Sequence, residues 1–172
     1  MEEGYFGEMS IKNAVLFVCL GNTCRSPAAA RLLMARLALE KVSPDSWLVD
    51  SAGLQAGRGQ PASNRMISAL ERRGLDLRAH RSRPLEDVIL DLYPLVLVME
   101  PQHRLDLLAR LPHLSEKVFL LAEMCGEQTG VPDPYGSDDL AYQRTVEQLE
   151  AYIERGFSRI VANSLININV NK

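Results

Sequence analysis

The chain has 172 residues, of which 47% are hydrophobic and 24% are charged, and its formal net charge is −3. That length and composition suit one globular domain, and the acidic balance argues against nucleic-acid binding. The apolar runs are shorter than a membrane span and the acidic start lacks a signal-peptide layout, so we expect a cytoplasmic protein without membrane association. Its three cysteines and three histidines are scattered, so we expect no metal and no other cofactor.

We divide the chain into a loose leader over residues 1–12, a single domain over residues 13–160 and a C-terminal tail over residues 161–172. The tail alternates apolar residues with asparagines, and we favour a frayed end over an added edge strand. Its alternating apolar residues are Ile166, Ile168 and Val170.

The first elements of the domain are a strand and a helix. Residues 14–18 are apolar without alternation, which predicts a strand buried on both faces. Ser26 and Pro27 predict a helix N-cap followed by proline at the first helical position, and apolar spacing carries that helix to about Lys41. Residues 47–51 predict a second strand.

The rest of the chain continues the alternation of helices and strands. In chain order we expect a helix from Pro61 to Gly74, a strand over 95–99, a helix from Pro101 to just before Pro112, a strand over 118–121, and a closing helix marked by apolar residues from Tyr142 to Ile160. Strands that alternate with helices pair in parallel through right-handed crossovers. The predicted fold is therefore a three-layer α/β/α domain.

The segment between the first strand and its helix has the composition of an anion site. It reads Cys19-Leu20-Gly21-Asn22-Thr23-Cys24-Arg25-Ser26. Ligands of open α/β sheets bind beyond the carboxyl ends of the strands, where backbone N–H groups meet the positive end of a helix. Gly21 allows a tight cradle, and the forked guanidinium of Arg25 suits two phosphate oxygens at once. We expect all eight residues to surround a phosphate group.

Cys19 is the candidate nucleophile of this loop. A helix N-terminus and a nearby cation favour the thiolate, which can attack phosphorus. We expect the Ser26 hydroxyl to donate a hydrogen bond to that sulfur. The turn lacks the G-x-G-x-x-G pattern of dinucleotide sites and the Gly-Lys-Ser/Thr ending of nucleotide triphosphate loops, so both classes are disfavoured.

Residues 18–27 resemble the signature of the low-molecular-weight protein tyrosine phosphatases. The resemblance extends through residues 50–53, 95–99 and 133–135 and covers roughly residues 13–160. It implies a four-stranded parallel sheet flanked by helices, a phosphocysteine intermediate, no metal, and inhibition by inorganic phosphate and other oxyanions.

Asp133 is the candidate general acid and base. Expelling a leaving group requires a proton donor, and hydrolysis of the intermediate requires a base. An aspartate between two prolines is by itself a turn former, but the family's acid loop matches at this residue. Tyr135 would line the cleft and stack on an aromatic substrate, with ordinary packing as the alternative. We place Leu54 or a neighbour at the opposite wall.

The resemblance also assigns a supporting network around the loop. Asn22, Ser51 and His80, together with Ser26, match family positions that hold the loop open, and asparagine tolerates the left-handed backbone of such a turn. Cys24 is either a reversible disulfide partner of Cys19 under oxidation or a small buried residue. Cys125 has no evident role.

The resemblance implies a tyrosine-phosphorylated protein as substrate, such as a bacterial tyrosine autokinase that controls exopolysaccharide export. Thr23 instead resembles the bacterial branch that removes phosphate from arginine, so a protein-arginine phosphatase is the alternative. Arsenate reduction would require resolving cysteines beyond Cys125. A non-catalytic phosphoprotein-binding module would require neither the nucleophile nor the acid, so both readings are remote.

A run of basic residues could serve phosphoprotein binding. Seven arginines lie between Arg58 and Arg83, against two acidic residues. We favour solvated arginines on helix and loop faces, with a basic rim that attracts acidic segments as the alternative.

Overall fold

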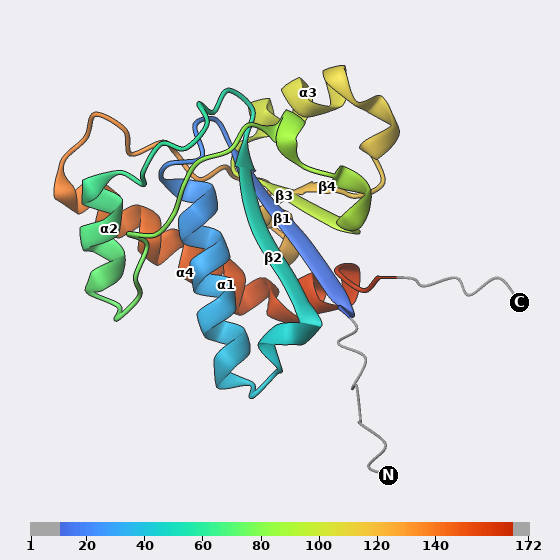
Figure 1. Cartoon of the computed structure of the whole chain (residues 1–172), viewed down its shortest axis with the longest axis horizontal. Helices are drawn as coiled ribbons and strands as arrows, with labels where there is room; N and C mark the ends of the chain where they lie inside the picture. Colours follow the sequence, from blue (N-terminus) through green and yellow to red (C-terminus); the bar gives the residue numbers. More distant parts are fainter. Residues whose placement is uncertain (1–10, 167–172) are drawn as a thin grey trace, which may run out of the picture.

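Four parallel strands form the centre of the structure, a computed structural model that describes residues 11–166 (Figure 1). The strands are β1 (Asn13–Cys19), β2 (Trp47–Gly53), β3 (Leu95–Val98) and β4 (Val118–Leu120), in the order β2-β1-β3-β4. All seven residues of β1 are buried because it lies between β2 and β3 and is covered on both faces. This burial explains its continuous apolar sequence.

Helices cover both faces of the sheet. They are α1 (Arg25–Leu39), α2 (Asn64–Glu71), α3 (Pro101–Arg110) and α4 (Asp139–Asn163). Val15 and Phe17 pack in one core with α1, α2 and α4, whereas Leu16 and Val18 pack in the other with α3 (Figure 1). The predicted three-layer α/β/α fold with a four-stranded parallel sheet is therefore confirmed.

Two helix starts differ from the sequence prediction. The helix expected at Pro61 begins at Asn64, because Pro61 forms an isolated antiparallel bridge with Arg81. Ser26 is not an N-cap: α1 begins at Arg25, and no side chain caps it. The Ser26 hydroxyl instead serves the loop that precedes the helix.

The two ends of the described chain meet at the amino end of β1. Leu165 forms an antiparallel bridge with Asn13, and the Ile166 N–H donates to the Lys12 carbonyl at 2.8 Å. The predicted leader up to residue 10, and Ile168 and Val170 of the predicted tail, lie outside the described residues. Among those described, no helix combines the length and apolar character needed to cross a membrane.

Candidate active site

The loop of residues 19–24 joins the carboxyl end of β1 to the first turn of α1. Asn22 adopts a left-handed conformation with φ of 54°, as the sequence predicts. Gly21 does not have a positive φ, and a Cβ added there would meet only Thr23 Oγ1, at 3.7 Å. The tight turn therefore depends on the asparagine rather than on the glycine.

The Cys19 sulfur is buried and surrounded by donors. Its Sγ lies 3.0 Å from Ser26 Oγ and 3.3 Å from the Asn22 backbone nitrogen. Asn22 Nδ2 donates to Ser26 Oγ at 2.9 Å, and the single Ser26 proton can point to the sulfur or to the Ala52 carbonyl oxygen, 3.3 Å from Oγ. This arrangement stabilises negative charge on sulfur.

The Asn22 side chain connects the loop to two other segments. Its Nδ2 also donates to Ser51 Oγ at 2.9 Å, and its Oδ1 accepts from the Arg83 backbone N–H at 2.9 Å. His80 Nε2 lies 2.7 Å from the Asn22 carbonyl oxygen, which can only accept, so Nε2 carries the proton. Burial lowers the pKa of His80. The structure thus brings together Asn22, Ser26, Ser51 and His80.

An outer set of contacts fixes Arg83 behind this network. Arg83 Nη2 lies 2.7 Å from Asp50 Oδ2, and its Nε donates to the Ser51 carbonyl at 3.0 Å. Tyr93 donates its hydroxyl to the same Asp50 oxygen at 2.9 Å. Burial, with Asp50 beside it, raises the pKa of Tyr93 to about 12. The sequence analysis missed Asp50, Arg83 and Tyr93 because their spacing in the chain carries no local signal.

Gly53, at the end of β2, lies directly against the loop. A Cβ at this position would come within 2.7 Å of the Leu20 carbonyl oxygen and 2.9 Å of the Asn22 nitrogen. Real Cβ atoms do not approach backbone atoms so closely, so this position requires glycine.

Arg25 is 2% exposed and binds carboxylates from two segments. Its Nη1 pairs with Glu100 and donates to the Val131 carbonyl at 2.9 Å, and its Nη2 donates to Asp133 Oδ2 at 2.8 Å. Its Nε is buried and has no hydrogen-bond partner among residues 11–166. A buried guanidinium donor without a partner beside a loop of backbone N–H groups is suited to an anion.

A hollow of about 220 Å³ opens over this loop. It is lined by residues 19–25 together with Asp133 and Tyr135. Tyr135 is 79% exposed, which places its ring at the mouth and not in the core. The opposite wall was expected at Leu54 or a neighbour, and for Leu54 this is wrong: it is 3% exposed, does not line the hollow and packs in the core with residues of the sheet and α3. The next residue, Gln55, is the exposed one.

A family model described as low molecular weight phosphotyrosine protein phosphatase matches residues 14–164. The chain belongs to this family. The probable low molecular weight protein-tyrosine-phosphatase EpsP of Ralstonia solanacearum is 34% identical over 148 residues, which cover 86% of this chain and 96% of EpsP. The protein-arginine-phosphatase of Geobacillus stearothermophilus is 35% identical over 142 residues, which cover 82% and 91% of the two chains.

A solved structure agrees with this assignment. The crystal structure of the low molecular weight protein tyrosine phosphatase from T. tengcongensis matches with a TM-score of 0.79 and 34% identity, covering 86% of this chain and 99% of that chain. The resemblance inferred from residues 18–27 is confirmed at the level of the low molecular weight phosphatase family.

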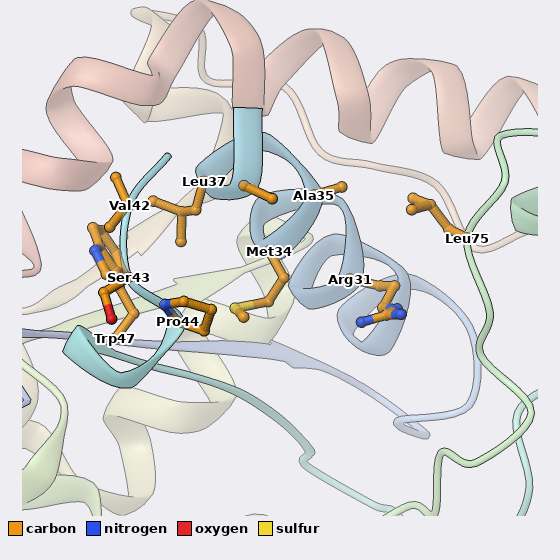
Figure 2. Close-up of a pocket in the computed structure, with 10 residues that line it drawn as sticks. Arg31, Met34, Ala35, Leu37, Val42, Ser43, Pro44, Trp47 and Leu75 are labelled. Carbon is orange, nitrogen blue, oxygen red and sulfur yellow. The ribbon is translucent and has the colours of Figure 1, made fainter. Parts of the chain in front are cut away.

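A second hollow of about 270 Å³ lies at the carboxyl-terminal half of α1 (Figure 2). Met34 and Leu37 of the helix line it together with Pro44 and Trp47, and its walls are mainly apolar. Cys19 precedes the opposite end of α1, and this hollow shares no lining residue with the hollow over the Cys19 loop. Within residues 11–166, no three His, Cys, Asp or Glu side chains are grouped to hold a metal ion.

All three cysteines are free thiols. Cys24 is buried, and burial raises the pKa of its thiol. Cys125 Sγ donates to the Ala122 carbonyl at 3.1 Å and is not among the residues that line the phosphatase hollow. The redox pairing of Cys24 with Cys19 stays a prediction.

The arginine-rich segment is largely neutralised by carboxylates. Five of its seven arginines form ion pairs, which are Arg58 with Asp87, Arg65 with Asp139, Arg73 with Glu150, Arg78 with Asp76, and Arg83 with Asp50. Arg81 donates to the carbonyls of Arg78 and His80. This pairing favours solvated arginine faces over a basic rim.

Proposed function

We propose that the protein hydrolyses phosphotyrosine in proteins through a phosphocysteine intermediate. The observation that carries the proposal is the surrounding of Cys19 Sγ, with Ser26 Oγ at 3.0 Å and the Asn22 N–H at 3.3 Å, beside the buried Arg25 guanidinium. A nucleophile, an oxyanion site and a carboxylic acid are the parts that this chemistry needs.

In the first step the Cys19 thiolate attacks phosphorus in line with the leaving oxygen. Arg25 and the loop N–H groups hold the equatorial phosphate oxygens, on which the negative charge is spread. The sulfur–phosphorus bond forms as the phosphorus–oxygen bond breaks. Protonated Asp133 gives its proton to the departing phenolic oxygen, which leaves as the tyrosine hydroxyl.

In the second step water hydrolyses the phosphocysteine. Asp133, now a carboxylate, takes a proton from the water as the oxygen attacks phosphorus. The sulfur–phosphorus bond breaks, inorganic phosphate is released, and the electron pair returns to Cys19. The hydrogen bond from Ser26 stabilises the departing thiolate, which makes the sulfur a better leaving group.

Tyr135 favours an aromatic substrate over phosphoarginine. Its ring is 79% exposed at the mouth of the hollow, where it can stack on a phenolic ring. Thr23, which also lines the hollow, supports the arginine alternative because its hydroxyl can orient the attacking water. Overall similarity does not decide, because the tyrosine- and arginine-directed relatives are 34% and 35% identical.

A substrate panel tests the assignment. Phosphotyrosine and phosphoarginine peptides of matched sequence are offered to the wild-type protein and to Thr23→Ile. We expect a higher kcat/KM for phosphotyrosine in the wild type, and a further loss of phosphoarginine turnover in Thr23→Ile. A large wild-type preference for phosphoarginine would overturn the proposal in favour of the arginine phosphatase.

The partners follow from the same site. Oxyanions such as phosphate should compete with substrate, and the relative Wzb of Escherichia coli K30 was solved in complex with sulphate. We propose a tyrosine-phosphorylated protein as substrate, which is supported by the probable tyrosine phosphatase EpsP among the relatives. A bacterial tyrosine autokinase of exopolysaccharide export is the candidate that the sequence resemblance implies.

A further inference from the structure

A buried histidine lies behind Arg25 without a role in the steps above. His103 is in the first turn of α3 and is 5% exposed. Its Nε2 lies 3.7 Å from Glu100 Oε1, the carboxylate oxygen that pairs with Arg25. Its Nδ1 is buried and has no hydrogen-bond partner in the part of the chain that the structure describes. A buried imidazole with an unused ring nitrogen is costly unless it serves another state.

The charges around Arg25 indicate that His103 serves the state in which an anion is bound. One guanidinium already faces two carboxylates, Glu100 and Asp133. A bound phosphate ester brings up to two further negative charges to the same cation. Like charges this close together favour proton uptake by any group that can accept a proton. The neutral imidazole of His103, beside Glu100, is such a group.

We propose that His103 takes up a proton when an oxyanion binds at Arg25. Protonated His103 then pairs with Glu100, and the Arg25 guanidinium turns its donors from Glu100 to the bound oxyanion. His103 is a positioning residue, because it acts on the oxyanion through Glu100 and Arg25 and does not line the hollow. The inference rests on the proposed oxyanion site and is independent of the choice between tyrosine and arginine.

The groups that face His103 give the direction of its titration. Burial lowers its pKa and Arg25 lowers it further, whereas Glu100, Asp106 and Asp133 act in the opposite sense. The imidazole is therefore neutral near neutral pH when the site holds no anion. An oxyanion offsets Arg25, which raises the pKa of His103. By reciprocity, protonation of His103 must strengthen oxyanion binding by the same factor.

Sulfate binding tests the proposal because sulfate stays a dianion across the whole pH range used. The reference protein carries Cys19→Ser and Asp133→Asn, which remove the thiol and one of the two carboxylates beside Arg25, and it keeps Glu100 and His80. Calorimetry in buffers of different ionisation enthalpy gives both affinity and proton uptake. We expect about tenfold tighter binding near pH 5.5 than near pH 7.5, with net proton uptake.

Adding His103→Gln should abolish both the pH dependence and the proton uptake. The matched control is His113→Gln, since His113 is exposed on the surface, and it should change neither. A His103→Gln protein that keeps the pH dependence would overturn the inference. The imidazole resonances of the reference protein give a second measurement that needs no His103 variant: the titration midpoint of His103 should rise when sulfate saturates the site, and an unchanged midpoint also overturns the inference.

The outcomes separate this inference from the proposed function. A reference protein that binds sulfate with no pH dependence contradicts the role of His103 and leaves the oxyanion site intact. Failure to bind sulfate at any pH contradicts the oxyanion site itself, and with it both proposals.

Discussion

The two sides of the catalytic loop are held by different kinds of contact. On the Asn22 side, the contacts are hydrogen bonds between uncharged groups: the Asn22 amide donates to Ser26 and Ser51, and His80 donates to the Asn22 backbone carbonyl. On the Arg25 side, they are ion pairs to Glu100 and Asp133. Neutral hydrogen bonds buried in the fold fix a shape, whereas ion pairs to a guanidinium can be exchanged for a charged ligand. The loop therefore combines a rigid half with an exchangeable half.

Removing a partner from the exchangeable side should cost rate more than binding. In Asp133→Ala we expect kcat for phosphotyrosine peptides to fall by ~10²–10⁴-fold, because the proton donor is lost. The effect should be larger for phenyl phosphate than for nitrophenyl phosphate, whose leaving group needs less protonation. Steady-state kinetics with the two aryl esters measure this difference.

The same variant should bind sulfate at least as tightly as the wild type and should keep its melting temperature. Arg25 retains Glu100 and the Val131 carbonyl, and it loses a competing anion. Unchanged phosphotyrosine turnover in Asp133→Ala would refute the acid assignment. A loss of sulfate affinity would show that the ion pair of Asp133 with Arg25 is needed to hold the loop and is not exchanged for the bound anion.

Removing the centre of the rigid side should damage binding and stability together. Asn22→Ala leaves Ser26 and Ser51 without their shared donor and places alanine at a φ of 54°. We expect a loss of about 1–3 kcal/mol in the free energy of unfolding, together with weakened sulfate binding. Urea denaturation and calorimetry provide the two measurements.

Asn22→Gly is the matched control for the backbone. Glycine adopts a positive φ without strain, so a defect that remains in Asn22→Gly belongs to the lost side-chain hydrogen bonds. If both variants bind sulfate as tightly as the wild type, the Asn22 side is not the rigid half of the loop.

We expect the smallest effect from a substitution in the outer set of contacts, at Tyr93. Tyr93→Phe removes the hydroxyl that donates to Asp50 and should cost about 1 kcal/mol of stability, with little change in kcat. The pKa of Tyr93 is raised to about 12, so in the wild type its contribution is present below the tyrosine's unfolded value and is lost as the pH rises toward 12. Denaturation between neutral and alkaline pH should show a shallower alkaline loss in Tyr93→Phe. An identical alkaline profile would exclude this origin.

On both sides of the loop, the sequence predicted the residues of the family motifs and missed residues that reach the loop from other segments. Asn22 and Ser26 lie within one unbroken motif, Ser51 lies in the matching stretch 50–53, and His80 was assigned through the family resemblance alone. Glu100 and His103 belong to no motif: they follow a strand as many polar residues do, and only the packing of α3 beside the loop brings them to Arg25. Sequence spacing carries no information about such long-range pairings.

The errors in the prediction also have local physical causes. Leu54 was placed at the cleft wall opposite Tyr135, yet its apolar side chain is buried in the core with residues of α3. Ser26 precedes proline as an N-cap would, but its hydroxyl is bound to Cys19 and Asn22. In each case a tertiary contact overrode a sound local preference.

Gly53 shows how strictly a distant segment can restrict this loop. The Leu20 carbonyl and the Asn22 amide occupy the space that a side chain at position 53 would need. The gene should therefore tolerate as little variation at codon 53 as at codon 19, although Gly53 does not line the hollow. A mutant library that varies only the residues lining the hollow would not include codon 53, where we expect most substitutions to disrupt the loop.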